Sequence, residues 1–111
     1  MNVSELIERL ELKLLTKKEY KERSVDGCYI GDLLSWVMGR AGSGDVWITI
    51  MNNVNIVAVA SLTECACILL AEGVKVEQEI IDRADSQDII IVSSKKTSYE
   101  LAAAVNKLIC L

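Results

Sequence analysis

The stretch GDVWITIMNNVNIVAVASLTECACILLAEG, residues 44–73, decides the fold. It holds two short apolar runs, Val46–Ile50 and Ala66–Ala71, joined by a segment with apolar residues at helical spacing. Runs that are apolar without alternation are typical of strands buried on both faces, as in parallel sheets. Parallel neighbours need a crossover, so we expect a helix over residues 53–62, although its apolar positions would also suit a strand.

The same alternation continues toward the C-terminus. A third apolar run, Ile89–Val92, predicts another buried strand, and helical spacing predicts helices over 76–85 and 98–109. Thr97 and Glu100 have the spacing of a capping box at the start of the last helix. The order strand, helix, strand, helix, strand, helix predicts an α/β layered domain with a mostly parallel sheet.

The residues before this pattern predict two further helices. Apolar spacing after a candidate cap, Asn2, predicts a helix over residues 3–10. The same spacing from Ile30 onward predicts a second helix, which Gly39 would cap. Residues 16–24 carry charges of both signs, and we expect them to form a solvated connection.

Composition excludes several classes of protein. With 111 residues, 51% hydrophobic and 25% charged, the chain has the make-up of one globular domain, which we expect to span residues 1–111. Its net charge of −4 argues against nucleic-acid binding. It has no histidine, which removes the Ser-His-Asp and Cys-His pairs and most general-base mechanisms near neutral pH. We therefore expect a protein that is not an enzyme.

Nothing in the sequence favours a membrane or secreted protein. Glu5, Glu8 and Arg9 stand where a signal peptide would be apolar. The longest apolar run, Cys65–Ala71, has seven residues, whereas a membrane span needs about 20. We expect a cytoplasmic location, with no membrane contact.

A glycine-rich loop and a pair of cysteines resemble a phosphate-binding loop and a metal site, but neither has the residues that such a site needs. The loop Gly39–Gly44 has the outer glycine spacing of a P-loop, but Asp45 and Val46 replace the required Lys and Ser/Thr, and the loop precedes a strand. Cys65 and Cys67 lack the two additional neighbouring ligands that a zinc or iron–sulfur site needs. We expect both cysteines to behave as small hydrophobes, with no metal or cofactor.

Polar residues follow two of the predicted strands, at the edge where α/β sheets bind ligands. The candidates are Ser93, Ser94, Lys95 and Thr97 after the third strand, and Asn52, Asn53 and Asn55 after the first. Hydroxyls, a lysine and a helix N-terminus together favour an anion such as phosphate. The alternative is that the hydroxyls and amides only cap helices and that the lysine is solvated.

The segment ERSVDGCYIGDLLS, residues 22–35, resembles the signature region of the DRTGG domain family. The resemblance continues through residues 44–50 and 55–62, Gly73 and the terminal helix, and so covers nearly the whole chain. The chain departs from the family in the name-giving part, where Glu22 replaces Asp, Asp26 replaces Thr and Cys28 replaces the second Gly.

The resemblance implies a small α/β regulatory domain similar to the N-terminal domain of HPr kinase/phosphorylase and to the regulatory region of some phosphotransacetylases. It supplies no catalytic residue. Because the family also occurs beside CBS modules, it implies sensing of an adenine-type nucleotide. Within the signature region, further ligand-binding candidates are Asp26, Gly27 as a turn with positive φ, Tyr29 as an amphipathic ring, and Asp32 near a helix start. Each of these also has a structural interpretation.

The leading hypothesis is a non-catalytic, homodimeric regulatory module that binds an adenine nucleotide or another phosphate at the carboxyl edge of the sheet. The alternative is a ligand-free interaction subunit that docks on a kinase or redox enzyme. Trp36 motivates the alternative, because it lies opposite the apolar stripe of its helix and is expected to be exposed. An enzyme stays open only if Asp26, Asp32 and Tyr29 cluster as acid and base.

Overall fold

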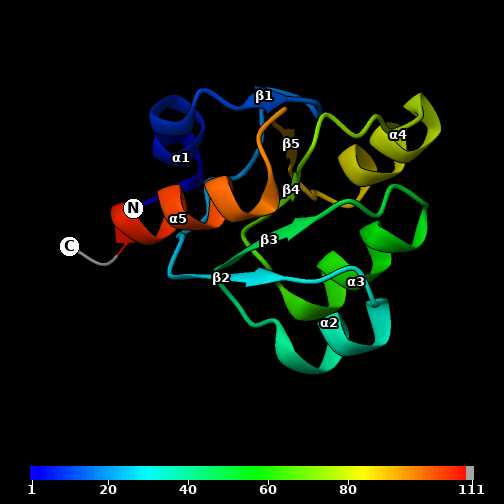
Figure 1. The fold of residues 1–111 in the computed structure, drawn as a ribbon. Helices are drawn as coiled ribbons and strands as arrows, with labels where there is room; N and C mark the ends of the chain where they lie inside the picture. The colour runs from blue at the N-terminus through cyan, green and yellow to red at the C-terminus, as the bar shows by residue number, and fades with distance from the viewer. Residues whose placement is uncertain (110–111) are drawn as a thin grey trace.

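Helices cover both faces of a five-stranded sheet in the computed structural model, which describes residues 1–109 (Figure 1). The elements are α1 (Val3–Leu10), β1 (Lys13–Leu14), β2 (Gly27–Ile30), α2 (Leu34–Arg40), β3 (Asp45–Thr49), α3 (Asn55–Thr63), β4 (Cys67–Leu70), α4 (Gln78–Ser86), β5 (Ile91–Ser93) and α5 (Ser98–Ile109). The predicted layered α/β fold is thereby confirmed. None of the helices in this part of the chain is long and apolar enough to cross a membrane.

The sheet is mixed but mostly parallel. Its strand order is β1-β5-β4-β3-β2, and the four strands from β2 to β5 run parallel to their neighbours. Only β1 is antiparallel, with Lys13 opposite Ser93 and Leu14 opposite Val92. The sequence did not predict β1, because two residues are too short to show a period.

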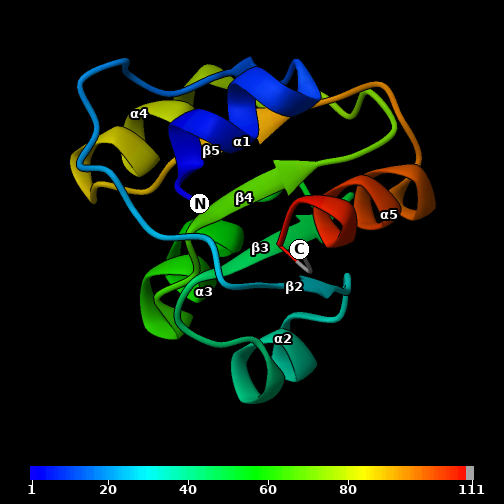
Figure 2. The ribbon, with the colours of Figure 1, turned by 90° about the vertical axis from the view of Figure 1, so that its left-hand side faces the viewer.

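Alternate residues of the central strands pack into two separate cores. Val46 and Ile48 pack in one core with residues of α1 and α5, whereas Trp47 between them packs in the other with residues of α2, α3 and α4. Figure 2 shows how these helices surround the sheet. The same alternation divides Cys67 from Ile68 on β4. Burial on both faces explains why these strands are apolar without alternation.

The region of β2 and α2 differs from the prediction. Ile30 is the last residue of β2, and the helix begins four residues later at Leu34. Gly39 lies inside α2 and has no positive φ, and the cap is Ala41 in extended conformation, so the predicted glycine cap is wrong. Pairing of β2 with β3 overrides the local helical spacing here, as tertiary contacts often do.

The other predicted helices are confirmed within a few residues. The expected caps are present at the starts of α1 and α5, whereas α3 and α4 begin without a side-chain cap hydrogen bond. The side chain of Asn2 accepts a hydrogen bond of 2.9 Å from the Glu5 amide at the start of α1. Residues 16–24 are only partly the solvated connection that was expected. Thr16 is buried, and its hydroxyl oxygen accepts the Ile91 amide at 3.1 Å, which extends the contact between β1 and β5.

Candidate functional site

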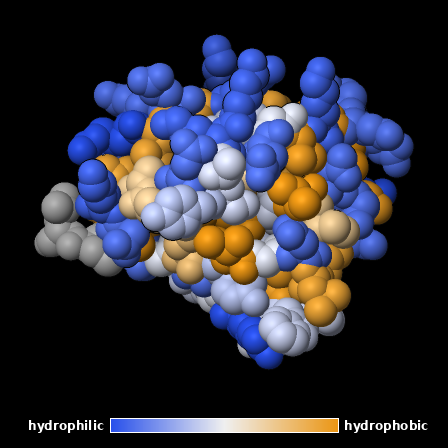
Figure 3. Space-filling view, in the orientation of Figure 1, coloured by the Kyte–Doolittle hydropathy of each residue, from blue (hydrophilic) through white to orange (hydrophobic). Residues whose placement is uncertain are grey.

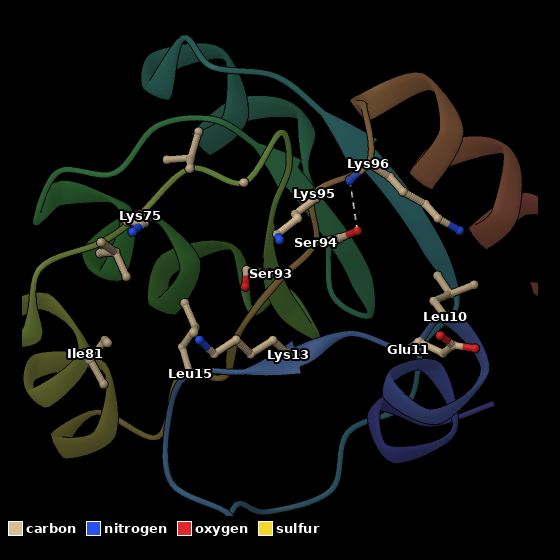
Figure 4. A pocket seen from close by; sticks show the side chains of 13 residues that line it. Leu10, Glu11, Lys13, Leu15, Lys75, Ile81, Ser93, Ser94, Lys95 and Lys96 are labelled. Carbon is tan, nitrogen blue, oxygen red and sulfur yellow. Dashed lines mark hydrogen bonds between the residues drawn. The ribbon is translucent and has the colours of Figure 1, made fainter.

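A cavity of about 680 Å³ opens at the carboxyl edge of the sheet, beside β1 and β5 (Figure 4). Its walls come from the end of α1, from β1, from α4 and from the connections that follow β4 and β5. Its volume lies within the range of about 300–1,000 Å³ that is usual for small-molecule sites. We call it the lysine cavity, because its lining includes Lys13, Lys75, Lys95 and Lys96.

The lysine cavity concentrates positive charge in a chain with a net charge of −4. Four of the chain's 12 basic residues line it, and Glu11 is the only acidic residue among the described residues that do so. In Figure 4, Ser93 and Lys95 lie near the centre of the view, with Lys13 below them. Clefts lined by one sign of charge focus the field and raise the local concentration of counter-ions. The cavity is therefore suited to an anion.

Backbone hydrogen bonds hold together the two connections that build one side of the lysine cavity. The amide of Glu72 donates to the Lys96 carbonyl at 2.8 Å, and the amide of Gly73 donates to the Ser94 carbonyl at 2.9 Å. Gly73 has φ of 69°, a left-handed conformation that glycine adopts at little cost. Lys75, Lys95 and Lys96 thus extend from two connections whose backbones are hydrogen-bonded to each other.

The residues after β5 divide between the cavity and the cap of α5. Ser93, Ser94 and Lys95 line the cavity as expected for a strand end, but Thr97 is not part of its wall. Thr97 and Glu100 form a complete capping box, in which the Thr97 amide donates to Glu100 at 3.1 Å and the Glu100 amide donates to the Thr97 hydroxyl at 3.2 Å.

The capping box also fills the place that was expected for an anion. Hydrogen bonds from the Thr97 backbone, and then from its hydroxyl, lower the pKa of Glu100, so a carboxylate already occupies the N-terminus of α5. The contacts of Thr97 are those of the capping interpretation. What remains for an anion is the lysines and hydroxyls of the cavity.

The three asparagines lie outside the lysine cavity. The side-chain amide of Asn52 donates to the Lys75 carbonyl at 2.8 Å and so supports the cavity from behind. Asn53 accepts the amide of Asn55 at 2.9 Å, which is a local contact at the start of α3. Asn52 and Asn53 line a smaller hollow of about 370 Å³, which is also lined by Glu77 and Glu79. Two carboxylates make this hollow unfavourable for an anion.

Asp32 fixes the connection between β2 and α2. Its carboxylate accepts the Thr49 hydroxyl at 2.8 Å and the Ile50 amide at 3.0 Å. It makes no capping contact, because the residue at the cap position of α2 is Leu33, without a side-chain hydrogen bond. Asp32 lies at the carboxyl edge of the sheet but does not line the lysine cavity.

Asp26 and Gly27 lie at the opposite, amino edge of the sheet, where β2 begins beside Asp45. Gly27 has no positive φ, so the predicted reason for this glycine is wrong. A Cβ at Gly27 would instead lie 2.5 Å from a carboxylate oxygen of Asp45, which makes close approach the reason. Tyr29 lies in the middle of β2, half-buried against the core under α2, α3 and α4.

Asp26, Asp32 and Tyr29 do not form the acid–base cluster on which an enzymatic function would depend. Asp26 precedes β2 and Asp32 follows it, so the length of a four-residue strand separates them. At about 3.3 Å per residue, the distance along this strand is much longer than a hydrogen bond, so the two carboxylates cannot act on the same proton. The two carboxylates lie at opposite edges of the sheet.

The name-giving segment of the signature region holds the first helix in place. Glu22 accepts the Ser4 amide at 3.1 Å, and the Val3 amide donates to the Arg23 carbonyl at 3.0 Å. The Val25 amide donates to the carbonyl of Met1 at 2.9 Å on the same side. A carboxylate at the first turn of α1 is favoured by the helix dipole, so Glu22 stabilises the start of α1.

Three of the lysines in the cavity were not among the sequence candidates. Lys13 reaches the cavity through β1, which pairs with β5 from far away in the sequence. Lys75 belongs to the connection after β4, and a search for basic residues after every predicted strand would have found it. Lys96 follows Lys95 in the segment that the sequence did single out.

Cys65 and Cys67 are buried thiols, as predicted, and Cys28 is half-buried. Burial, and then the nearby carboxylate of Asp45, raises the pKa of Cys28 to about 11. Burial also raises the pKa of Cys65 to about 11 and raises that of Cys67 further. Among residues 1–109 no group of side chains is arranged to hold a metal ion. Cys110, one residue from the C-terminus, lies outside the described residues.

We expect these three thiols to react slowly in the folded protein. A raised pKa leaves little thiolate at pH 8, and the thiolate is the reactive form. The burial of the thiols stabilises the fold fully below their ordinary pKa of 9.0, and this contribution is lost as the pH rises toward 11. Titration of the Cys110→Ser variant with a chromogenic disulfide measures how fast the three remaining thiols react.

The same titration in denaturant supplies the control. All three thiols should react at once in urea, and in native buffer the rate should rise steeply above pH 9. Rapid reaction of two or more thiols at pH 8 without denaturant would show that the two cores are more open than described.

The fold and the cavity together define a small α/β domain that presents a cationic site at the carboxyl edge of its sheet. The family model for the DRTGG domain matches residues 5–108, so the chain belongs to the DRTGG domain family. The resemblance expected from residues 22–35 is thereby confirmed. A comparison with curated proteins finds no match.

The structure is also similar to a solved regulatory region. This is the crystal structure of the CBS and DRTGG domains of the regulatory region of Clostridium perfringens pyrophosphatase, complexed with its activator, diadenosine tetraphosphate. The TM-score is 0.70 at 13% sequence identity, and the match covers 93% of this chain and 45% of that one. At this identity the similarity shows a shared fold, and the chain spans less than half of that structure.

Proposed function

We propose that this chain is a non-catalytic regulatory module that binds a small phosphate-bearing ligand in the lysine cavity. The observation that carries the proposal is the set of four lysines around a concave site at the edge where α/β sheets bind ligands. The regulatory region with the same fold was crystallised with an adenine nucleotide as activator, which supports a nucleotide-like ligand here.

The chemistry of the cavity favours phosphate over a carboxylate of equal size. Each ammonium group offers three donors, and a phosphate group offers enough oxygens to accept from several lysines at once. Lys13 and Lys95 come from different segments of the chain, and Ser93 lies near the middle of the view, above Lys13 (Figure 4). The lysines are exposed, so screening by salt should weaken the binding.

Calorimetric titration of the full chain tests the proposal. The panel is ATP, ADP, AMP, acetyl-CoA and inorganic tripolyphosphate, at low and at physiological salt. We expect at least one of them to bind, and Lys95→Ala to weaken the affinity about tenfold, as loss of one charge-assisted contact typically does. Raising the salt should weaken binding further, and no ligand should be hydrolysed or transferred.

Two variants serve as matched controls. Lys107→Ala removes an exposed lysine of α5 outside the cavity, and Asn53→Ala alters the acidic hollow instead. Both should bind as the unaltered chain does. A flat response to the whole panel, or equal losses in Lys95→Ala and Lys107→Ala, would contradict the proposal.

A specific observation also favours a protein contact. The side chains of Leu33 and Trp36 are 60% and 53% exposed, and the Arg40 guanidinium lies 3.8 Å from the centre of the Trp36 ring. Figure 3 shows apolar side chains among the charged ones over the lower right, where α2 lies. Such exposed apolar residues mark interaction sites. We therefore propose that the surface around α2 contacts either a second copy of this chain or a partner enzyme.

Light scattering distinguishes these alternatives. A mass near twice the 12.2 kDa of the chain supports a dimer, and Trp36→Ala should then return it to the monomer. A monomeric mass at all concentrations would remove the dimer and leave docking on a different protein as the role of α2.

A further inference from the structure

The lysine cavity has an apolar part that a bare phosphate would not use. Leu15, Val76 and Ile81 line it between β1 and α4, and none of the described residues of the cavity is aromatic. In Figure 4, Leu15 and Ile81 both lie on the left of the view, below Lys75, and Lys13 is directly to the right of Leu15. All three aliphatic side chains are only half-buried, so apolar surface faces the open cavity.

The charged and apolar parts are joined in one short connection. Lys75 and Val76 are neighbours, and the side chain of Asn52 donates to the Lys75 carbonyl at 2.8 Å. The same connection is joined to the residues after β5 through the Gly73 amide and the Ser94 carbonyl, 2.9 Å apart. One rigid segment therefore places a cation beside an apolar surface.

The opposite end of the cavity is less favourable for an anion. Glu11, Leu10 and Lys96 lie on the right of the view in Figure 4, away from Leu15 and Ile81. The carboxylate of Glu11 offsets part of the positive charge at that end. Lys13, Lys75 and Lys95 lie away from that carboxylate, so their positive charge is not offset by it (Figure 4).

We infer that the ligand is an amphipathic phosphate ester, whose phosphate contacts Lys13, Lys75 and Lys95 while its uncharged group packs against Leu15, Val76 and Ile81. This rests on the function proposed above and narrows it from phosphates in general to phosphate esters. Burial of the uncharged group adds affinity in proportion to the apolar area removed from water, and inorganic phosphates gain nothing from it. The nucleoside of a nucleotide and a short alkyl chain share the required chemistry.

Matched pairs of ligands test this inference on the full chain. ATP is compared with inorganic tripolyphosphate, and butyl phosphate with inorganic phosphate, by calorimetry at low salt. We expect the ester of at least one pair to bind about tenfold tighter than its inorganic partner. A gain only in the first pair identifies a nucleoside, and a gain in the second identifies an alkyl group.

Variants assign the effect to the two parts of the cavity. Ile81→Ala, which keeps a good helix former in α4, should weaken the ester about fivefold and leave the inorganic partner unchanged. Lys95→Ala should weaken both members of a pair. Leu62→Ala, at an exposed apolar residue of α3 outside the cavity, should change neither.

The outcomes separate this inference from the function on which it rests. If neither member of either pair binds, the proposed phosphate site fails. If inorganic tripolyphosphate binds as tightly as ATP, inorganic phosphate as tightly as butyl phosphate, and Ile81→Ala has no effect, the site stands and the amphipathic ligand is wrong. Far-UV circular dichroism and a melting curve confirm that each variant is folded.

Discussion

Replacing Trp47 with alanine lowers the free energy of unfolding by about 3–5 kcal/mol, the usual cost of truncating a buried tryptophan. Trp47 is fully buried in the middle of β3, between α2, α3 and α4. Its indole N–H donates to the Gly31 carbonyl at 2.9 Å, which anchors the connection between β2 and α2. Domains of this size are stable by about 5–15 kcal/mol, so this one change brings the fold close to unfolding.

Urea denaturation followed by far-UV circular dichroism measures this effect, since Trp36 would complicate a fluorescence signal. Trp47→Phe is the matched variant, because it keeps a large apolar ring and loses the donor to Gly31. It should cost about 1–3 kcal/mol, because the smaller ring fills less of the core and the part-buried hydrogen bond to Gly31 is lost. Equal midpoints for Trp47→Ala and the unaltered chain would show that β3 is not central to the sheet.

Replacing Leu101 with alanine is expected to cost about 2–5 kcal/mol. Leu101 and Val105 are the buried residues of α5, and they pack on the face of the sheet that also carries α1. The β5–α5 connection contributes Lys95 and Lys96 to the lysine cavity, so loosening α5 should also weaken ligand binding.

An exposed residue of the same helix provides the control. Tyr99 is 81% exposed, so Tyr99→Ala should change the free energy of unfolding by less than about 0.5 kcal/mol. Urea midpoints of the two variants decide the comparison. Similar losses for both would mean that α5 does not pack through Leu101.

The central strands could be predicted because burial on both faces leaves a local signature. Residues 46–50, 66–71 and 89–92 are apolar without alternation, and they contain most of β3, β4 and the first part of β5. The edge strands lack this signature. Short β2 includes Gly27 and half-buried residues, and it forms because β3 offers an unpaired edge. Non-local pairing of this kind cannot be read from spacing.

The site could be predicted only in part, for the same reason. Ser93, Ser94 and Lys95 were found because they follow a strand whose end was visible in the sequence. Lys13 joins them only through an antiparallel pairing across about 80 residues of chain. The signature region suggested residues such as Asp26, which the fold places at the other edge of the sheet. A motif marks a family, whereas the fold decides which residues meet.

Amide chemical-shift mapping of the full chain with ATP tests the central claim most directly, because it locates the ligand without any substitution. We predict shifts that saturate with ATP and are confined to residues 10–15, 73–76, 81 and 93–96, the walls of the lysine cavity. Shifts centred on residues 22–28, at the amino edge, would contradict the account.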